Sequence, residues 1–346
     1  MTWRRRCALR LTCLLGVVLA AAAAYGQQQS EPTGADWELH ALGVPVGERL
    51  EAARAIAGGR PVVLAIVGQG GVSETLLQPA LGEHATLEYR DGAMDPGTST
   101  HDTAAARVIL DLTSRLGVQV RLLVYQPGEP FRDVADAMAK AGAEADIVAF
   151  FQSFWGPDVS YITDAIAQAD GCLFVSPYVE YQSRPTSTCV QAHSAKPWAE
   201  GLAHFVTAAP VAYKAPGRIL QPASGEEDTE IINFVAPSYY ASGAGGTCPA
   251  GEVTAAVAAY VMAASPSEPS PAEVVAIMRE TVALDTAVLA ERLGYDAATA
   301  AELVEQIAAL TSPEQGPRKL DAAGVLDLWA IHQRLVSAHP PAAGQR

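Results

Sequence analysis

The sequence FVAPSYYASGAGGTCPAGEVTAAVAAYV, residues 234–261, decides the fold. Its first residues continue an apolar run of strand length, which predicts a buried strand over Ile231–Ala236. A glycine-rich turn follows, and the small residues after it predict a helix over Gly251–Ala264. A buried strand that leads through a glycine turn into a helix is typical of an α/β protein with a parallel sheet.

The same alternation extends from Trp37 to about His332. Apolar runs predict further strands at Val62–Val67, Val118–Tyr125, Asp146–Phe151, Gly171–Ser176 and Ala203–Ala209. Helical spacing predicts further helices at Gly47–Ala57, His101–Leu116, Phe131–Ala141, Val159–Ala169, Pro271–Val282, Ala297–Leu310 and Ala322–Val336. Near-continuous apolar strands are expected where helices cover both faces of a parallel sheet. We therefore predict one α/β domain over residues 37–336, with three layers and a mostly parallel central sheet.

The N-terminus has the pattern of a secretory signal peptide. Arginines at positions 4–6 precede an apolar run over Leu9–Ala24, and small residues surround Gly26. This pattern predicts cleavage after Gly26 and export to a periplasm or the outside of the cell. We expect residues 27–36 to form a short polar leader and residues 337–346 a flexible tail. No later segment is apolar over a length that would cross a membrane.

Composition excludes two classes of protein. The chain of 346 residues is 49% hydrophobic and 18% charged, which is inconsistent with a disordered acidic protein. Its net charge of −15 argues against nucleic-acid binding, which needs a basic surface. Cleavage of the signal peptide would leave Cys172, Cys189 and Cys248. Sequence proximity favours a Cys172–Cys189 disulfide, and pairing of Cys248 with either of the others stays open.

Four segments, taken in order, resemble the subtilisin-like serine peptidases (peptidase S8 family, or subtilases). They are VVLAIVGQGGVSETLLQPAL (62–81), THDTAAARVI (100–109), GCLFVSPYVE (171–180) and the stretch over 234–261. Weaker likenesses lie in DIVAFFQSFWG (146–156), SPAEVVAIMRET (270–281) and KLDAAGVLDL (319–328). The resemblance covers roughly Trp37 to Val336 and implies the subtilase fold and a polypeptide substrate or ligand.

The resemblance assigns roles to individual positions and also shows departures from the family pattern. His101 matches the family's base, and Cys248 stands at the nucleophile position. Gly68 occupies the position of the aspartate that orients the base, and Val179 that of the oxyanion-binding asparagine. The residue after His101 is Asp102, where the family has glycine. The segment Ser153, Phe154, Trp155 and Gly156 matches part of the family's substrate-binding strand.

Three interpretations of the function follow. Because three of four catalytic positions differ, the first is a catalytically impaired pseudopeptidase that binds extended peptides by strand addition. The second is an active endopeptidase with Cys248 as nucleophile, His101 as base and a surrogate acid, either Glu74 or Asp102. The third is a periplasmic small-molecule binding protein with two α/β lobes. No interpretation requires a cofactor or a metal, and the oligomeric state stays open. A folding propeptide, usual in secreted subtilases, is not expected here.

Overall fold

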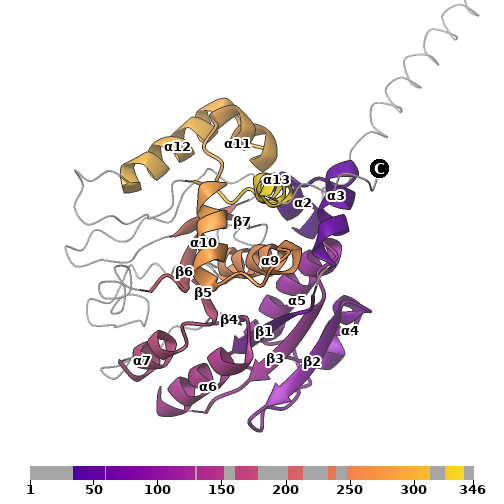
Figure 1. Cartoon of the computed structure of the whole chain (residues 1–346), viewed down its shortest axis with the longest axis vertical. Helices are drawn as coiled ribbons and strands as arrows, with labels where there is room; N and C mark the ends of the chain where they lie inside the picture. The colour runs from indigo at the N-terminus through magenta and orange to yellow at the C-terminus, as the bar shows by residue number, and fades with distance from the viewer. Residues whose placement is uncertain are drawn as a thin grey trace, which may run out of the picture. The chain divides into compact units, whose positions relative to one another are not determined.

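Seven strands form one sheet in which every neighbouring pair is parallel (Figure 1). The computed structural model describes residues 34–58, 60–128, 131–151, 160–177, 202–212, 233–238, 248–311 and 324–338. The order β2-β3-β1-β4-β5-β6-β7 unites β1 (Val62–Val67), β2 (Ala85–Arg90), β3 (Val120–Tyr125), β4 (Ile147–Ala149), β5 (Leu173–Pro177), β6 (Phe205–Ala212) and β7 (Phe234–Ser238). The predicted α/β fold with a parallel sheet is therefore confirmed. The two-lobed interpretation is wrong, because all the described strands belong to one sheet.

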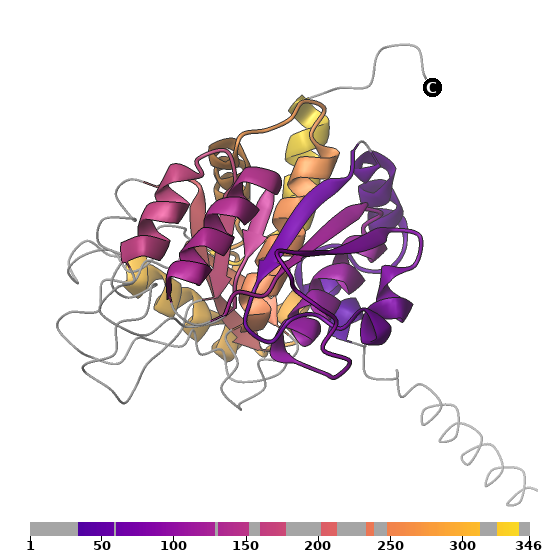
Figure 2. The same cartoon turned by 90° about the horizontal axis from the view of Figure 1, so that it is seen from below.

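Helices cover both faces of this sheet (Figure 2). On one face lie α6 (Phe131–Glu144) and α7 (Ser160–Gln168), and on the other α5 (His101–Arg115) and α9 (Cys248–Ala264). The remaining described helices are α2 (Gly34–Ala41), α3 (Glu48–Ala57), α4 (Glu74–Leu81), α10 (Pro271–Glu280), α11 (Thr286–Leu293), α12 (Ala297–Thr311) and α13 (Leu328–Ala338). The three predicted layers are thus present.

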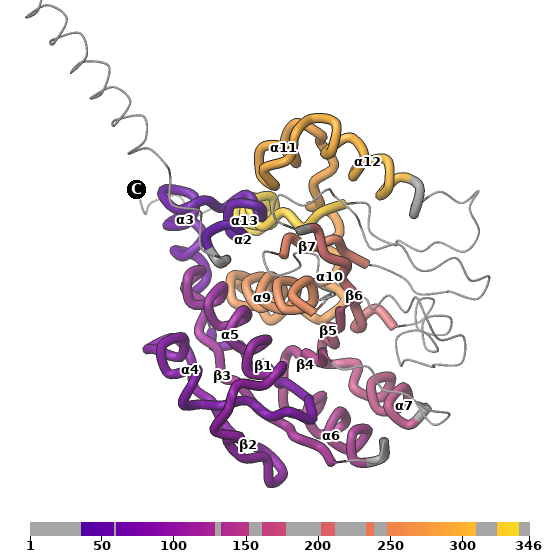
Figure 3. The backbone as a smooth tube through the Cα atoms, turned by 180° about the vertical axis from the view of Figure 1, so that it is seen from behind, coloured from indigo at the N-terminus to yellow at the C-terminus, as the bar shows by residue number. Residues whose placement is uncertain are grey.

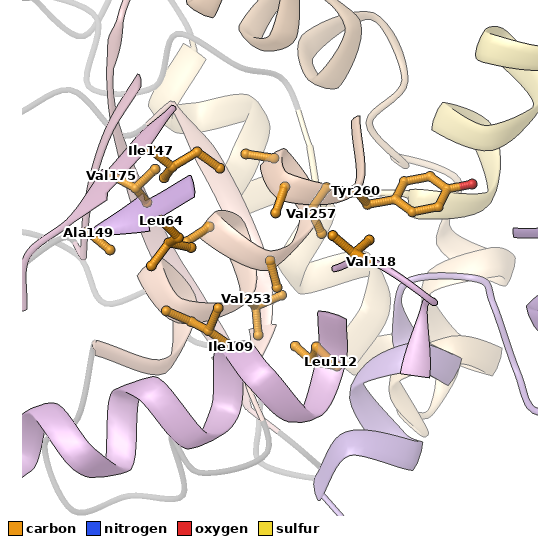
Figure 4. Close-up of a cluster of buried hydrophobic side chains, with 14 of the residues drawn as sticks. Leu64, Ile109, Leu112, Val118, Ile147, Ala149, Val175, Val253, Val257 and Tyr260 are labelled. Atoms are coloured by element: carbon orange, nitrogen blue, oxygen red, sulfur yellow. The ribbon is translucent and has the colours of Figure 1, made fainter. Parts of the chain in front are cut away.

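The main core lies between the sheet and the pair α5 and α9. Leu64 of β1 and Val175 of β5 project from the sheet toward Val253 of α9 and Ile109 of α5 (Figure 4). Helix α9 is buried along nearly its whole length, which its small residues allow because they let strands and helices approach closely. Seen from behind, α9 lies beside α5 over the sheet (Figure 3). This packing fixes the start of α9 relative to the start of α5.

Several elements differ from their predicted bounds. Helix α9 begins three residues earlier than predicted, at Cys248, so the cysteine opens the helix. Helix α13 begins at Leu328 rather than at Ala322. Strand β2 and helices α2, α4 and α11 were not predicted. β2 is an edge strand whose side chains are only partly buried or exposed, so it lacks a continuous apolar run. α4 is short and contains Pro79, which interrupts the helical pattern.

The cysteines do not form the expected bridge. Cys172 and Cys248 both carry free thiols, and Cys172 is fully buried on the face covered by α6 and α7. The expected partner, Cys189, lies outside the described residues, as does the predicted signal peptide, which stays a prediction. Within the described parts of the chain, no helix combines the length and apolar character needed to cross a lipid bilayer.

A capping box holds the start of α10. Ser270 Oγ accepts a hydrogen bond from Glu273 N at 3.3 Å, and the Glu273 carboxylate accepts one from Ser270 N at 2.8 Å. We expect Ser270→Ala to lower the free energy of unfolding by about 1 kcal/mol, because the Glu273 N–H in the first turn of α10 has no carbonyl within the helix to pair with. Urea unfolding measures this, with the exposed Ser267→Ala as the matched control. Equal stability of the two variants would contradict the capping role.

Candidate active site

The start of α5 is held against the loop that follows β1. Thr100 caps the helix by accepting a hydrogen bond from Thr103 N at 3.0 Å. Its hydroxyl also donates to the Gly71 carbonyl at 2.6 Å, and Ser73 N donates to Thr103 Oγ1 at 2.9 Å. His101 and Asp102 stand in the first turn of this helix. These bonds therefore fix both side chains relative to the carboxyl end of β1.

Asp102 fills the space above Gly68. A Cβ atom added to Gly68 would lie 2.5 Å from Asp102 Cγ and Oδ1, closer than any side chain tolerates. Gly70 N donates a hydrogen bond to Asp102 Oδ2 at 2.9 Å, and the aspartate is 1% exposed. The carboxylate of Asp102 thus occupies the place that an acidic side chain at residue 68 would take. Glycine at 68 and aspartate at 102 are complementary in space.

The free oxygen of this carboxylate faces His101. Asp102 Oδ1 is buried without a hydrogen-bond partner in the described structure and lies 3.7 Å from His101 Nδ1. This is an ion-pair distance slightly longer than a hydrogen bond, and a small movement of the half-exposed imidazole would close it. Interaction with the Asp102 carboxylate, and secondly with Cys248, raises the pKa of the His101 imidazole to about 10. The imidazolium form is therefore strongly favoured between these two groups.

Cys248 reaches the site from the other helix. Its thiol donates to the Phe151 carbonyl at 3.6 Å, and its charge interaction with His101 is among the causes of the raised histidine pKa. Gly251 permits this position, because a Cβ atom there would lie 2.9 Å from the backbone nitrogen of Pro177. The first turn of α9 consequently packs against the ends of β4 and β5. A carboxylate, an imidazole and a thiol meet at the carboxyl edge of the sheet.

Other expected site residues have different outcomes. Glu74, the alternative surrogate acid, opens α4, and its carboxylate accepts a hydrogen bond from the Gln78 side chain of the same helix at 3.3 Å. Val179 and the segment Ser153, Phe154, Trp155 and Gly156 lie outside the described residues. In the described ranges no cluster of three histidine, cysteine or acidic side chains has an arrangement that would hold a metal ion.

One residue near the site was not predicted from the sequence. Glu252 is 4% exposed in the second turn of α9, and the charge of His101 acts on it. The signal was present, since Glu252 is the single charged side chain in the 17 residues of that helix. A lone acid in an apolar helix, one turn after a candidate nucleophile, is the pattern that would have identified it.

Comparison with known proteins shows a similarity in structure but no match in sequence. No family model matches the sequence, and no curated protein matches it. Among solved structures, the chain resembles the serine protease MycP1, an essential component of the type VII (ESX-1) secretion system. The TM-score is 0.52 with 14% identity, covering 88% of this chain and 90% of MycP1. A lanthipeptide protease gives a TM-score of 0.52 with 13% identity, covering 86% and 94%. The chain therefore has the fold of the subtilisin-like serine proteases.

Proposed function

We propose that the protein is a cysteine-type endopeptidase built on a subtilisin-like fold, with Cys248 as nucleophile, His101 as proton carrier and Asp102 as the orienting acid. The observation that carries the proposal is the carboxylate of Asp102 over Gly68, with its free oxygen turned to His101. Nucleophile, base and orienting acid are the three groups that this chemistry needs. The acid comes from α5 rather than from the end of β1.

The charges in the site determine the order of the steps. Attack on a peptide carbonyl needs the thiolate form of Cys248, and the imidazole of His101 can hold the proton that the thiol gives up. The thiolate adds to a peptide carbonyl carbon, and the imidazolium gives its proton to the leaving amine as the C–N bond breaks. The neutral imidazole then takes a proton from water, which attacks the thioester. Release of the acid product restores thiolate and imidazolium.

The surroundings of the thiol support a polypeptide substrate. The carbonyl that Cys248 contacts belongs to Phe151, two residues before the segment that resembles a substrate-binding strand. An extended peptide that binds beside Phe151 would pass the sulfur. The resemblance assigns Val179 to the oxyanion position, where valine has no side-chain donor, and loss of one such donor lowers turnover by about two to three orders of magnitude. We therefore expect slow cleavage, and we expect the protein to act after export.

Covalent labelling tests the proposal without knowledge of the natural substrate. The chain from Gln27 onward is treated with biotinylated peptide acyloxymethyl ketones, whose carboxylate leaves when a thiolate attacks. We expect the label on Cys248, located by mass spectrometry, and we expect none in Cys248→Ala. Cys172→Ala is the matched control and should label normally, because burial raises the pKa of that thiol and keeps it unreactive.

Sequence also supports a competing function, peptide binding without cleavage, since Val179 replaces the oxyanion asparagine. In that case peptides would bind equally well to the unsubstituted protein, to Cys248→Ala and to His101→Ala. No label would appear at Cys248 and no peptide would be cut. That combination of results would overturn the endopeptidase proposal.

A further inference from the structure

Helix α9 contains one carboxyl group that its packing does not explain. The helix is otherwise built from apolar and small side chains and is buried, yet Glu252 sits within it at 4% exposure. Burial is the largest cause of the shift in its pKa, and the charge of His101 is the second. Burial of an ionisable group disfavours its charged form. An apolar residue there would fit the helix better, so the acid needs another explanation.

The position of Glu252 relates it to the proposed nucleophile. Residues four apart share one face of a helix, so Glu252 lies one turn beyond Cys248 on the same side. Helix α9 packs against α5, which presents His101 and Asp102 in its first turn. Cys248, His101 and Asp102 therefore lie at the starts of the two helices, and Glu252 lies one turn along α9, near enough for the charge of His101 to act on it.

Few other charges can reach this carboxyl. The strands packed on α9, namely β1, β4, β5, β6 and β7, contain no ionisable side chain. The charged side chains of α3 and α10 are exposed. On α5, Asp102 is buried in the first turn, and Arg107, Asp111 and Arg115 lie further along that helix. His332 of α13 bonds the Tyr260 hydroxyl at 3.0 Å, two turns further along α9. Burial raises the pKa of Glu252 to about 7, and His101 is the one charged group that lowers it.

We propose that Glu252 is a positioning residue that acts through His101: when ionised, it stabilises the imidazolium and with it the thiolate of Cys248. This inference rests on the proposed function. The carboxyl does not touch the reacting atoms, and its influence is the field of one buried charge. Glu252 changes charge near neutral pH. When the pH falls and its carboxyl is protonated, the imidazolium of His101 loses this support.

Titration of His101 tests the inference directly. The ring of ¹⁵N-labelled histidine is followed by NMR across pH 5 to 11 in the unsubstituted protein, in Glu252→Gln and in Cys248→Ala. A unit charge acting through an effective dielectric constant of about 20 shifts a nearby pKa by about one unit. We therefore expect Glu252→Gln to lower the pKa of His101 by about one unit, which is a tenfold decrease in the proton affinity of its ring. The exposed Glu302→Gln is the matched control and should leave it unchanged.

The outcomes separate this inference from the proposed function. If His101 responds to Cys248→Ala but not to Glu252→Gln, the role of Glu252 is refuted and the catalytic pair stands. If His101 ignores Cys248→Ala, the pair itself is refuted. Should Glu252→Gln fail to fold, the unsubstituted protein still decides: its His101 resonance shows a second inflection near pH 7 if Glu252 acts on the ring, and a single step if it does not.

Discussion

Asp102→Gly is expected to slow labelling of Cys248 by a peptide electrophile by about 10²- to 10⁴-fold, and a second change, Gly68→Asp, is expected to restore much of that loss. The single variant removes the carboxylate that faces His101 Nδ1. The double variant supplies a carboxylate from the end of β1 into the same space, since a side chain at residue 68 points where Asp102 now lies. Pseudo-first-order labelling rates at fixed probe concentration measure both effects.

The converse substitution gives a matched control. Gly68→Ala alone places a methyl group 2.5 Å from Asp102 Cγ, so the carboxylate must move and the labelling rate should fall. In the Asp102→Gly background the same methyl group enters free space, and Gly68→Ala should change nothing further. The four proteins form a double-mutant cycle with a large coupling energy.

Two results would contradict the assignment of Asp102. Full labelling in Asp102→Gly would show that the acid does not orient His101. Additive effects of the two single changes would show that residues 68 and 102 do not share the space. Glu74→Gln should label normally, because the Glu74 carboxylate bonds the Gln78 side chain within α4; a large loss there would point to the other surrogate acid.

The layers of the fold could be predicted because burial controls them. Val62–Val67 was predicted with the observed bounds, since a strand covered on both faces reads as an unbroken apolar run. The edge strand Ala85–Arg90 lacks that signal, because side chains such as Glu88 remain partly in solvent. The carboxylate of Glu88 accepts a hydrogen bond from Arg121 of the neighbouring strand β3. Helix α4 was missed because glycine and proline surround and interrupt it. Edge strands and short helices depend on tertiary contacts that cannot be predicted from a single sequence.

The site was only half predictable. His101 and Cys248 were identified from the resemblance to the subtilase motifs, and the structure brings them together. Gly68 and Asp102 were each taken as a departure from the family pattern, and their complementarity depends on a contact between residues 34 positions apart in sequence. The exchange of glycine for aspartate at one position and aspartate for glycine at the other leaves the composition of the site unchanged. Three-dimensional proximity is what turns two apparent losses into one relocated carboxylate.

Glu252→Gln is also expected to change how stability depends on pH. In the unfolded chain the Glu252 carboxyl releases its proton near its ordinary pKa of 4.5, whereas burial raises the folded pKa to about 7. A raised acid pKa means that the folded state binds the proton more tightly. The stability linked to that proton is therefore complete below pH 4.5 and is lost as pH rises to 7. The whole change amounts to about 3 kcal/mol.

Glutamine keeps the shape of the side chain and carries no ionisable proton, so it escapes this loss. Urea unfolding between pH 4 and pH 8 should show Glu252→Gln gaining about 3 kcal/mol relative to the unsubstituted protein. Glu302→Gln should show no trend, and a constant difference for Glu252→Gln would refute the buried, proton-binding carboxyl. If Glu252→Gln is more stable at pH 8 and also lowers the pKa of His101, then the acid reduces folding stability but stabilises the imidazolium. The residue lowers stability in the pH range where the pair that it supports would work.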